Sequence, residues 1–122
     1  MFIALVIINI VLALGFLASG LAKVSQPRAA LAKRGMGWTD DFSVVNVKLI
    51  GAAEVVGAVG LVVPLLTGVA PVLSPIAAVC LAIIMVGAIV VHVRRSESFL
   101  PALILAIVSL VSAILGFIWI AR

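Results

Sequence analysis

The sequence has few of the side chains on which most enzyme mechanisms depend. Cys80 is the only cysteine and His92 the only histidine among 122 residues. A single cysteine excludes an intrachain disulfide and catalysis by an internal dithiol. Without a cluster of cysteine and histidine residues, the sequence predicts no metal site.

Charged residues are also scarce, at 10% of the chain, whereas 66% of residues are hydrophobic. A soluble domain is about half apolar and about a quarter charged. A water-soluble protein this short could not bury so much apolar surface in one core. The composition therefore predicts that residues 1–122 form a single membrane domain.

Four apolar runs are long enough to cross a bilayer, at residues 2–22, 44–65, 72–93 and 99–120. A hydrocarbon core about 30 Å thick takes roughly 20 helical residues. Backbone polar groups must be paired internally in lipid, which predicts helices. The expected fold is an all-α transmembrane four-helix bundle. Three prolines, Pro64, Pro71 and Pro75, are predicted to end the second span and start the third.

The basic residues are unevenly distributed among the linkers. Linkers 23–43 and 94–98 hold six of them, Lys23, Arg28, Lys33, Arg34, Arg94 and Arg95, whereas linker 66–71 has no charge. The positive-inside rule predicts that both basic linkers are cytoplasmic and that both termini are outside. The net charge of +4 is thus explained by topology. No nucleic-acid motif is present, so we expect the lipid bilayer and no nucleic acid as partner.

The first linker is expected to contain a short interfacial helix at residues 29–34. Pro27 suits a first-turn position, and Gly35 suits the end of a helix. Trp38 suits the headgroup region of a bilayer. A solvated basic loop is the alternative.

Small residues recur four positions apart in every span, at Gly15 and Ser19, Ala53 and Gly57, Ala78 and Ala82, and Ser112 and Gly116. This spacing lets helix backbones approach closely. It indicates a tightly packed bundle, and the same faces could also pack against another chain in a homo-oligomer.

Glu54 lies near the middle of the second span, where a carboxylate costs about 3 kcal/mol or more. We expect it to face the bundle interior. Asn9, Ser109 and Ser112 lie at depths that could bring them near it. The hypothesis is a polar intramembrane cluster of these four residues, which either holds the helices together or handles a proton or a ligand.

Lys48 and His92 lie near the cytoplasmic ends of their spans. One interpretation is interface anchoring, with the Lys48 ammonium reaching toward water. The other is that both converge with Lys23 on a cytoplasm-facing pocket for an anionic or quinone-like group. Lys48 and Glu54 are six positions apart on one helix, so no direct ion pair between them is expected.

Two segments carry a family resemblance, G-L-A-K at 20–23 and K-L-I-G-A-A-E at 48–54. With the glycines and prolines that follow, and His92 in the third span, the chain resembles the DoxX-like family of small four-helix membrane proteins over nearly its whole length. The positions that match the family pattern are Gly20, Lys23, Lys48, Gly51, Glu54 and His92, which form the candidate functional set.

The resemblance implies a bacterial plasma membrane and a link to redox complexes. The family is named after a subunit of an archaeal thiosulfate:quinone oxidoreductase, and other relatives are associated with oxidative-stress and thiol-redox complexes. It implies another membrane protein subunit as partner and, as cofactor, at most a quinone. It implies no particular reaction, so whether the chain is an enzyme stays open.

Three functions are therefore in competition. The first is an accessory or assembly subunit of a larger, redox-linked membrane complex. The second is a quinone- or lipid-binding oxidoreductase component that uses the carboxylate of Glu54. The third is a small transporter, which is disfavoured because four short helices enclose little room and show no inverted repeat.

Overall fold

The computed structural model describes all residues, 1–122, and contains helices only. In chain order these are α1 (Phe2–Ser25), α2 (Arg28–Lys33), the 3-10 helix η1 (Gly37–Asp41), α3 (Val44–Thr67), α4 (Leu73–Arg94) and α5 (Leu100–Ala121). The four longest, α1, α3, α4 and α5, are long and apolar enough to cross a membrane. The predicted four-helix fold is confirmed. The short helix α2 lies one residue earlier than expected, and η1 was not predicted.

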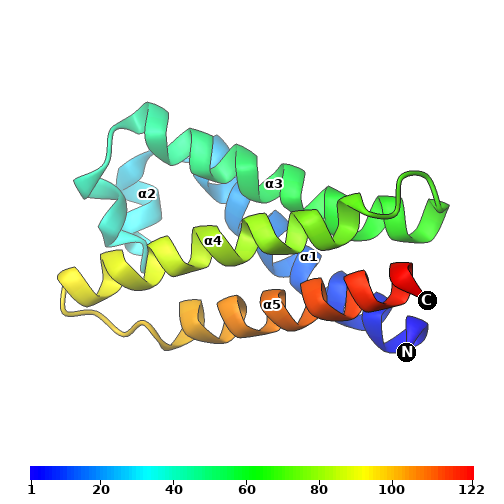
Figure 1. The fold of residues 1–122 in the computed structure, drawn as a ribbon. Coiled ribbons are helices and arrows are strands. Elements are labelled where there is room, and N and C mark those ends of the chain that lie inside the picture. Colours follow the sequence, from blue (N-terminus) through cyan, green and yellow to red (C-terminus); the bar gives the residue numbers. More distant parts are fainter.

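The long helices form an up-and-down bundle in which each packs against two neighbours, in the cyclic order α1, α3, α4, α5. Both termini lie at one end together with the turn between α3 and α4 (Figure 1). We call this the terminal end. The other end holds α2, η1 and the linker between α4 and α5, and we call it the basic end. Residues 26–43, which contain α2 and η1, are called the cap.

The boundaries of α3 follow from its sequence. Ser43 caps the start, where its hydroxyl accepts a hydrogen bond from the Asn46 backbone at 3.1 Å. Gly68 ends the helix in a left-handed conformation with φ 74°. The prediction that Pro64 ends the second span is wrong, because α3 continues through Pro64 to Thr67. Pro75 does lie in the first turn of α4.

The core of the bundle is built from a few large side chains set against small ones. Phe16, Leu61 and Leu81 are almost fully buried at its centre. A Cβ placed on Gly57 would lie 2.7 Å from Leu81 Cδ2, so this glycine makes room for the leucine. Lipid is as apolar as these side chains, so close packing rather than removal from water stabilises such contacts.

A second, smaller core attaches the cap to the bundle. Leu31 of α2 is fully buried against Ala22 and Val47. The Arg28 guanidinium donates a hydrogen bond to the Phe42 carbonyl at 2.8 Å and so joins the two ends of the cap. The cap is therefore a packed structure at the basic end, where it covers the ends of α1 and α3.

Candidate functional site

Helices α1 and α3 cross in direct backbone contact at two glycines. A Cβ on Gly20 would lie 2.6 Å from the Gly51 carbonyl oxygen and 2.8 Å from Val55 Cγ2. A Cβ on Gly51 would lie 2.7 Å from both the Gly20 carbonyl oxygen and Lys23 Cβ. No other residue type fits at either position. This contact explains why both glycines belong to the segments that carry the family resemblance.

Three residues beyond each glycine, a lysine and a glutamate form a buried ion pair. The Lys23 ammonium donates to Glu54 Oε1, and the two side chains are 6% and 1% exposed. Lys23 also donates to the Ser19 hydroxyl at 2.7 Å. Taking two charges out of water is costly, and mutual attraction together with hydrogen bonds offsets that cost. The pair therefore holds α1 and α3 in one register.

The Lys23 side chain runs from the basic end toward the middle of the bundle. On antiparallel helices that cross at Gly20 and Gly51, Lys23 and Glu54 are offset by six residues, or roughly 9 Å along the axis. Side chains on a helix tilt toward its N-terminus, which directs this lysine past Ser19 toward Glu54. A lysine near a helix end usually turns its ammonium outward. Here the buried carboxylate draws it inward.

The ion pair lines two cavities under the cap. One, of about 320 Å³, also has Phe16, Trp38, Met85 and His92 in its wall. The other, of about 330 Å³, shares Lys23, Trp38, Glu54, Met85 and Ala88 with the first. The Lys23 ammonium lies 5.4 Å from the centre of the Trp38 ring, within range of a cation–π contact. The pair is thus removed from bulk solvent but open to a small molecule.

This arrangement leaves both a hydrogen-bond acceptor and a hydrogen-bond donor available to a ligand. The protein contacts of Glu54 involve Oε1, which leaves Oε2 to accept from another donor. An ammonium has three N–H groups, and Lys23 uses two of them on Ser19 and Glu54. No three His, Cys, Asp or Glu side chains come together as ligands for a metal ion.

The structure divides the predicted polar cluster into two separate parts. Asn9 donates to the Leu61 carbonyl at 2.9 Å and to the Ser74 hydroxyl at 3.0 Å, and it accepts from Ser112. Leu61 is seven residues, or roughly 10 Å, along α3 from Glu54. Asn9 and Ser112 therefore form a neutral network with Ser74 in the terminal half, without Glu54.

Ser109 belongs to neither part. It is fully buried on α5, one turn from Ser112, and its hydroxyl has no hydrogen-bond partner. The depth argument was correct in placing it inside the bundle. It could not say which direction the hydroxyl faces.

The three residues of the predicted cytoplasm-facing pocket do not meet in one place. Lys23 shares one cavity with His92 and a different cavity with Lys48. Lys48 is exposed and donates to the Val24 carbonyl at the end of α1 at 3.3 Å, as an interface anchor would. As expected, Lys48 makes no ion pair with Glu54.

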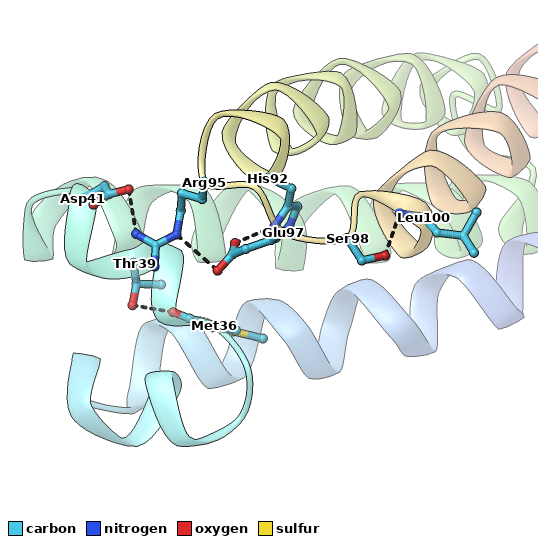
Figure 2. A network of polar contacts seen from close by, with 8 residues as sticks. All are labelled: Met36, Thr39, Asp41, His92, Arg95, Glu97, Ser98 and Leu100. Carbon is cyan, nitrogen blue, oxygen red and sulfur yellow. Dashed lines mark hydrogen bonds and ion pairs between the residues drawn. The ribbon is translucent and has the colours of Figure 1, made fainter.

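Above these cavities, a network of charged residues joins the linker between α4 and α5 to η1 (Figure 2). Arg95 contacts Asp41 at 2.8 Å and Glu97 at 3.2 Å, and His92 Nδ1 lies 3.0 Å from Glu97. We call these four residues the latch. The His92 contact, with help from Arg95, lowers the pKa of Glu97. Hydrogen bonds to Asp41 and then Glu97 raise the pKa of Arg95.

Sequence reasoning did not foresee the Lys23–Glu54 pair or the place of Trp38 against it. The signal was the spacing of Gly20 to Lys23 and of Gly51 to Glu54. On antiparallel helices that cross at these glycines, the two residues lie roughly 9 Å apart along the axis, which the long lysine side chain can bridge. The latch had no comparable signal, because Asp41 is far in sequence from Arg95 and Glu97, and His92 was singled out for a different site.

Comparison with known proteins agrees with the structural features described so far. Residues 7–116 match the family model described as the DoxX-like family. No curated protein and no solved structure matches the chain. The match includes the glycine crossing, the Lys23–Glu54 pair and all four long helices, and by it this chain belongs to the DoxX-like family.

Proposed function

We propose that this membrane protein binds a molecule of the quinone or lipid class, with its polar head against the Lys23–Glu54 pair. The observation that carries the proposal is a buried ion pair that lines two cavities. Ionisable groups at membrane depth are rare, and they mark ligand sites and proton pathways. A pair that only joined two helices would need no space beside it.

The size and chemistry of the cavities fit such a head group. Ligand sites usually have volumes of about 300–1,000 Å³, are mostly apolar and contain a few well-placed polar groups. Lys23 can donate to a carbonyl oxygen, and Glu54 can accept from a hydroxyl or take its proton. Trp38 supplies an aromatic face. His92 borders one cavity and can orient the head group, whereas Lys48 lies outside both cavities.

A short-chain quinone, decylubiquinone, tests this proposal through quenching of Trp38 fluorescence in a Trp119→Phe background. The double variant Lys23→Met with Glu54→Leu removes both charges together and so leaves no unpaired buried ion. We expect its affinity to fall about tenfold or more, because hydrogen bonds to charged groups contribute roughly 1.5–3 kcal/mol.

Ser112→Ala is the matched control, because it removes a buried polar group in the other half of the bundle. Its affinity should equal that of the wild type. Equal quinone affinity in the wild type and the double variant would contradict the quinone assignment. A phospholipid whose binding requires Lys23 and Glu54 would then identify the ligand as a lipid.

A second role is favoured by how little chain lies outside the long helices. Apart from Met1 and Arg122, only residues 26–43, 68–72 and 95–99 do so, and none of these three linkers is long enough to form a domain of its own. We propose that the protein acts as an accessory or assembly subunit of a larger membrane complex, and the link to redox chemistry rests on the family resemblance. Purification at native expression in mild detergent should yield a stoichiometric partner by mass spectrometry. Repeated isolation of the chain alone would count against this role.

We also propose that the protein lies in the plasma membrane with its basic end in the cytoplasm. All lysines and arginines except Arg122 lie toward that end. In a Cys80→Ala background, a membrane-impermeant maleimide applied to intact cells should label Thr67→Cys and leave Ser96→Cys unlabelled. The reverse pattern would invert the topology.

A further inference from the structure

A third cavity, of about 460 Å³, lies where α1 ends and α2 and α3 begin, and we call it the basic cavity. It is lined by Lys23, Ser25, Gln26, Pro27, Arg28, Leu31, Val44, Val47 and Lys48. No acidic residue is among them. Since Glu54 neutralises Lys23 from the other side, the uncompensated charges of this cavity are those of Arg28 and Lys48.

From this geometry we infer that the basic cavity binds a phosphate group with a net negative charge, as carried by the head of an anionic phospholipid. The site is distinct from the proposed ligand site, because Arg28 and Lys48 line neither of the cavities beside Glu54. Basic pockets between transmembrane helices at the cytoplasmic side are suited to such head groups.

Both cations have donors to spare for a phosphate. Arg28 uses Nη1 on the Phe42 carbonyl at 2.8 Å, and a guanidinium has five N–H donors in total. Lys48 makes one long contact of 3.3 Å, to the Val24 carbonyl, so its ammonium can turn toward an anion. Phosphate oxygens match both groups, and arginine can bind them in a bidentate manner.

Gln26 gives a second, independent indication of a ligand. Gln26 is one of the residues that line the cavity, and its Oε1 is buried without any hydrogen-bond donor. An amide can present its oxygen or, turned over, its NH₂ group at the same place. A phospholipid head with both hydroxyl and phosphate oxygens can satisfy either orientation.

The surroundings of the cavity favour a lipid over a free ion as the source of the phosphate. The cavity lies at the ends of two membrane-spanning helices, which is the depth of the headgroups. Exposed apolar side chains lie on the same two helices one turn or less from it, at Leu21, Val24, Val45 and Leu49. Acyl chains can lie along them while the phosphate occupies the cavity.

Native mass spectrometry of the whole chain in non-ionic detergent tests the inference. The probes are phosphatidylglycerol and phosphatidylcholine with the same acyl chains. We expect phosphatidylglycerol to bind at least about tenfold more tightly than phosphatidylcholine. The double variant Arg28→Gln with Lys48→Gln should lose that preference. The matched control is Lys33→Gln with Arg34→Gln, which removes the same charge from exposed positions outside the cavity and should keep the preference.

Three results decide the matter. Equal binding of the two lipids by the wild type, or an equal loss in both double variants, would overturn the inference. Inorganic phosphate is also tested on the lipid-free protein. If it binds as tightly as phosphatidylglycerol, and only when Arg28 and Lys48 are present, the site is supported and its ligand is a free phosphate. Quinone binding should be unchanged in Arg28→Gln with Lys48→Gln, which separates this test from that of the proposed function.

Discussion

The bundle buries two groups of polar side chains, and they differ in charge and in access. In the half toward the basic end, Lys23 and Glu54 carry full charges beside two cavities. In the terminal half, Asn9, Ser74 and Ser112 are neutral and satisfy one another and the Leu61 carbonyl. The three cavities at the basic end have none of these three residues in their walls.

The difference shows how the role of a polar residue at membrane depth can be inferred from its charge and from the space beside it. A neutral network whose members are satisfied within the protein needs no ligand to explain it, and it joins helices at modest energy. A charged pair is much more costly to bury, so space beside it indicates a use other than helix association. This difference supports placing the proposed ligand site in the half under the cap rather than in the terminal half.

The largest expected effect tests whether Lys23 and Glu54 act as a pair. Glu54→Leu leaves a buried ammonium without its partner, which should lower the free energy of unfolding by about 3–5 kcal/mol. Adding Lys23→Met should recover most of that loss, because no charge is then buried. Unfolding of the single and double variants in mixed micelles measures both values. A double variant as unstable as Glu54→Leu would contradict the pairing.

The next effect concerns the glycine crossing that places the pair. Gly51→Ala puts a methyl group 2.7 Å from the Gly20 carbonyl, so the helices must separate. Such overpacking should cost about 1–3 kcal/mol. Gly87→Ala is the control, because nothing lies within 4 Å of its added carbon. It should be neutral or stabilising by up to about 1 kcal/mol, the helix-propensity gain of alanine over glycine. Equal losses in both variants would show that the crossing has no special role.

These contacts also show what the sequence could and could not predict. The four long helices begin and end within about three residues of the predicted spans, because roughly 20 apolar residues are needed to cross a bilayer and little else fits. The burial of Glu54 and Asn9 followed from the cost of exposing them to lipid. Their partners did not follow, because depth along a helix does not specify rotation about it.

The site itself was found only in part, for a related reason. Lys23 was assigned to the basic linker 23–43 and to a cytoplasm-facing pocket with Lys48 and His92, not to a pair with Glu54. Only the crossing at Gly20 and Gly51 reveals that this side chain points inward. The placement of Trp38 in the headgroup region stays a prediction. Its approach to Lys23 depends on η1, whose fold is determined by contacts with the rest of the cap.

A smaller effect tests the neutral network with two serines on one helix. Ser112→Ala removes a hydrogen bond to Asn9 and should lower the free energy of unfolding by about 0.6 kcal/mol, and at most about 1.7. Ser109→Ala removes a buried hydroxyl without a partner and should be neutral or slightly stabilising. A Ser109→Ala loss as large as that of Ser112→Ala would show that Ser109 has a partner after all.

The smallest effect concerns the latch, which lies at the basic end and is partly exposed to water. Its residues Arg95 and Glu97 follow the end of α4 at Arg94. The pKa of Glu97 is lowered, first by its contact with His92 and then by Arg95. A lowered pKa in the folded state means that the latch contributes its full stability above the ordinary carboxyl pKa of about 4.3. That contribution is lost as the pH falls through the lower folded value. The raised pKa of Arg95 lies far above this window.

Fluorescence of Trp38 in the Trp119→Phe background measures this loss. Trp38 lies in η1, and Arg95 connects η1 to Glu97 because it contacts both Asp41 and Glu97. We expect a signal that is constant near neutral pH and changes below about pH 4.3. Glu97→Gln should change the signal at neutral pH and flatten the profile. A profile identical in the wild type and Glu97→Gln would show that Glu97 does not cause the transition, and the cap would then be held by its apolar contacts around Leu31 rather than by the latch.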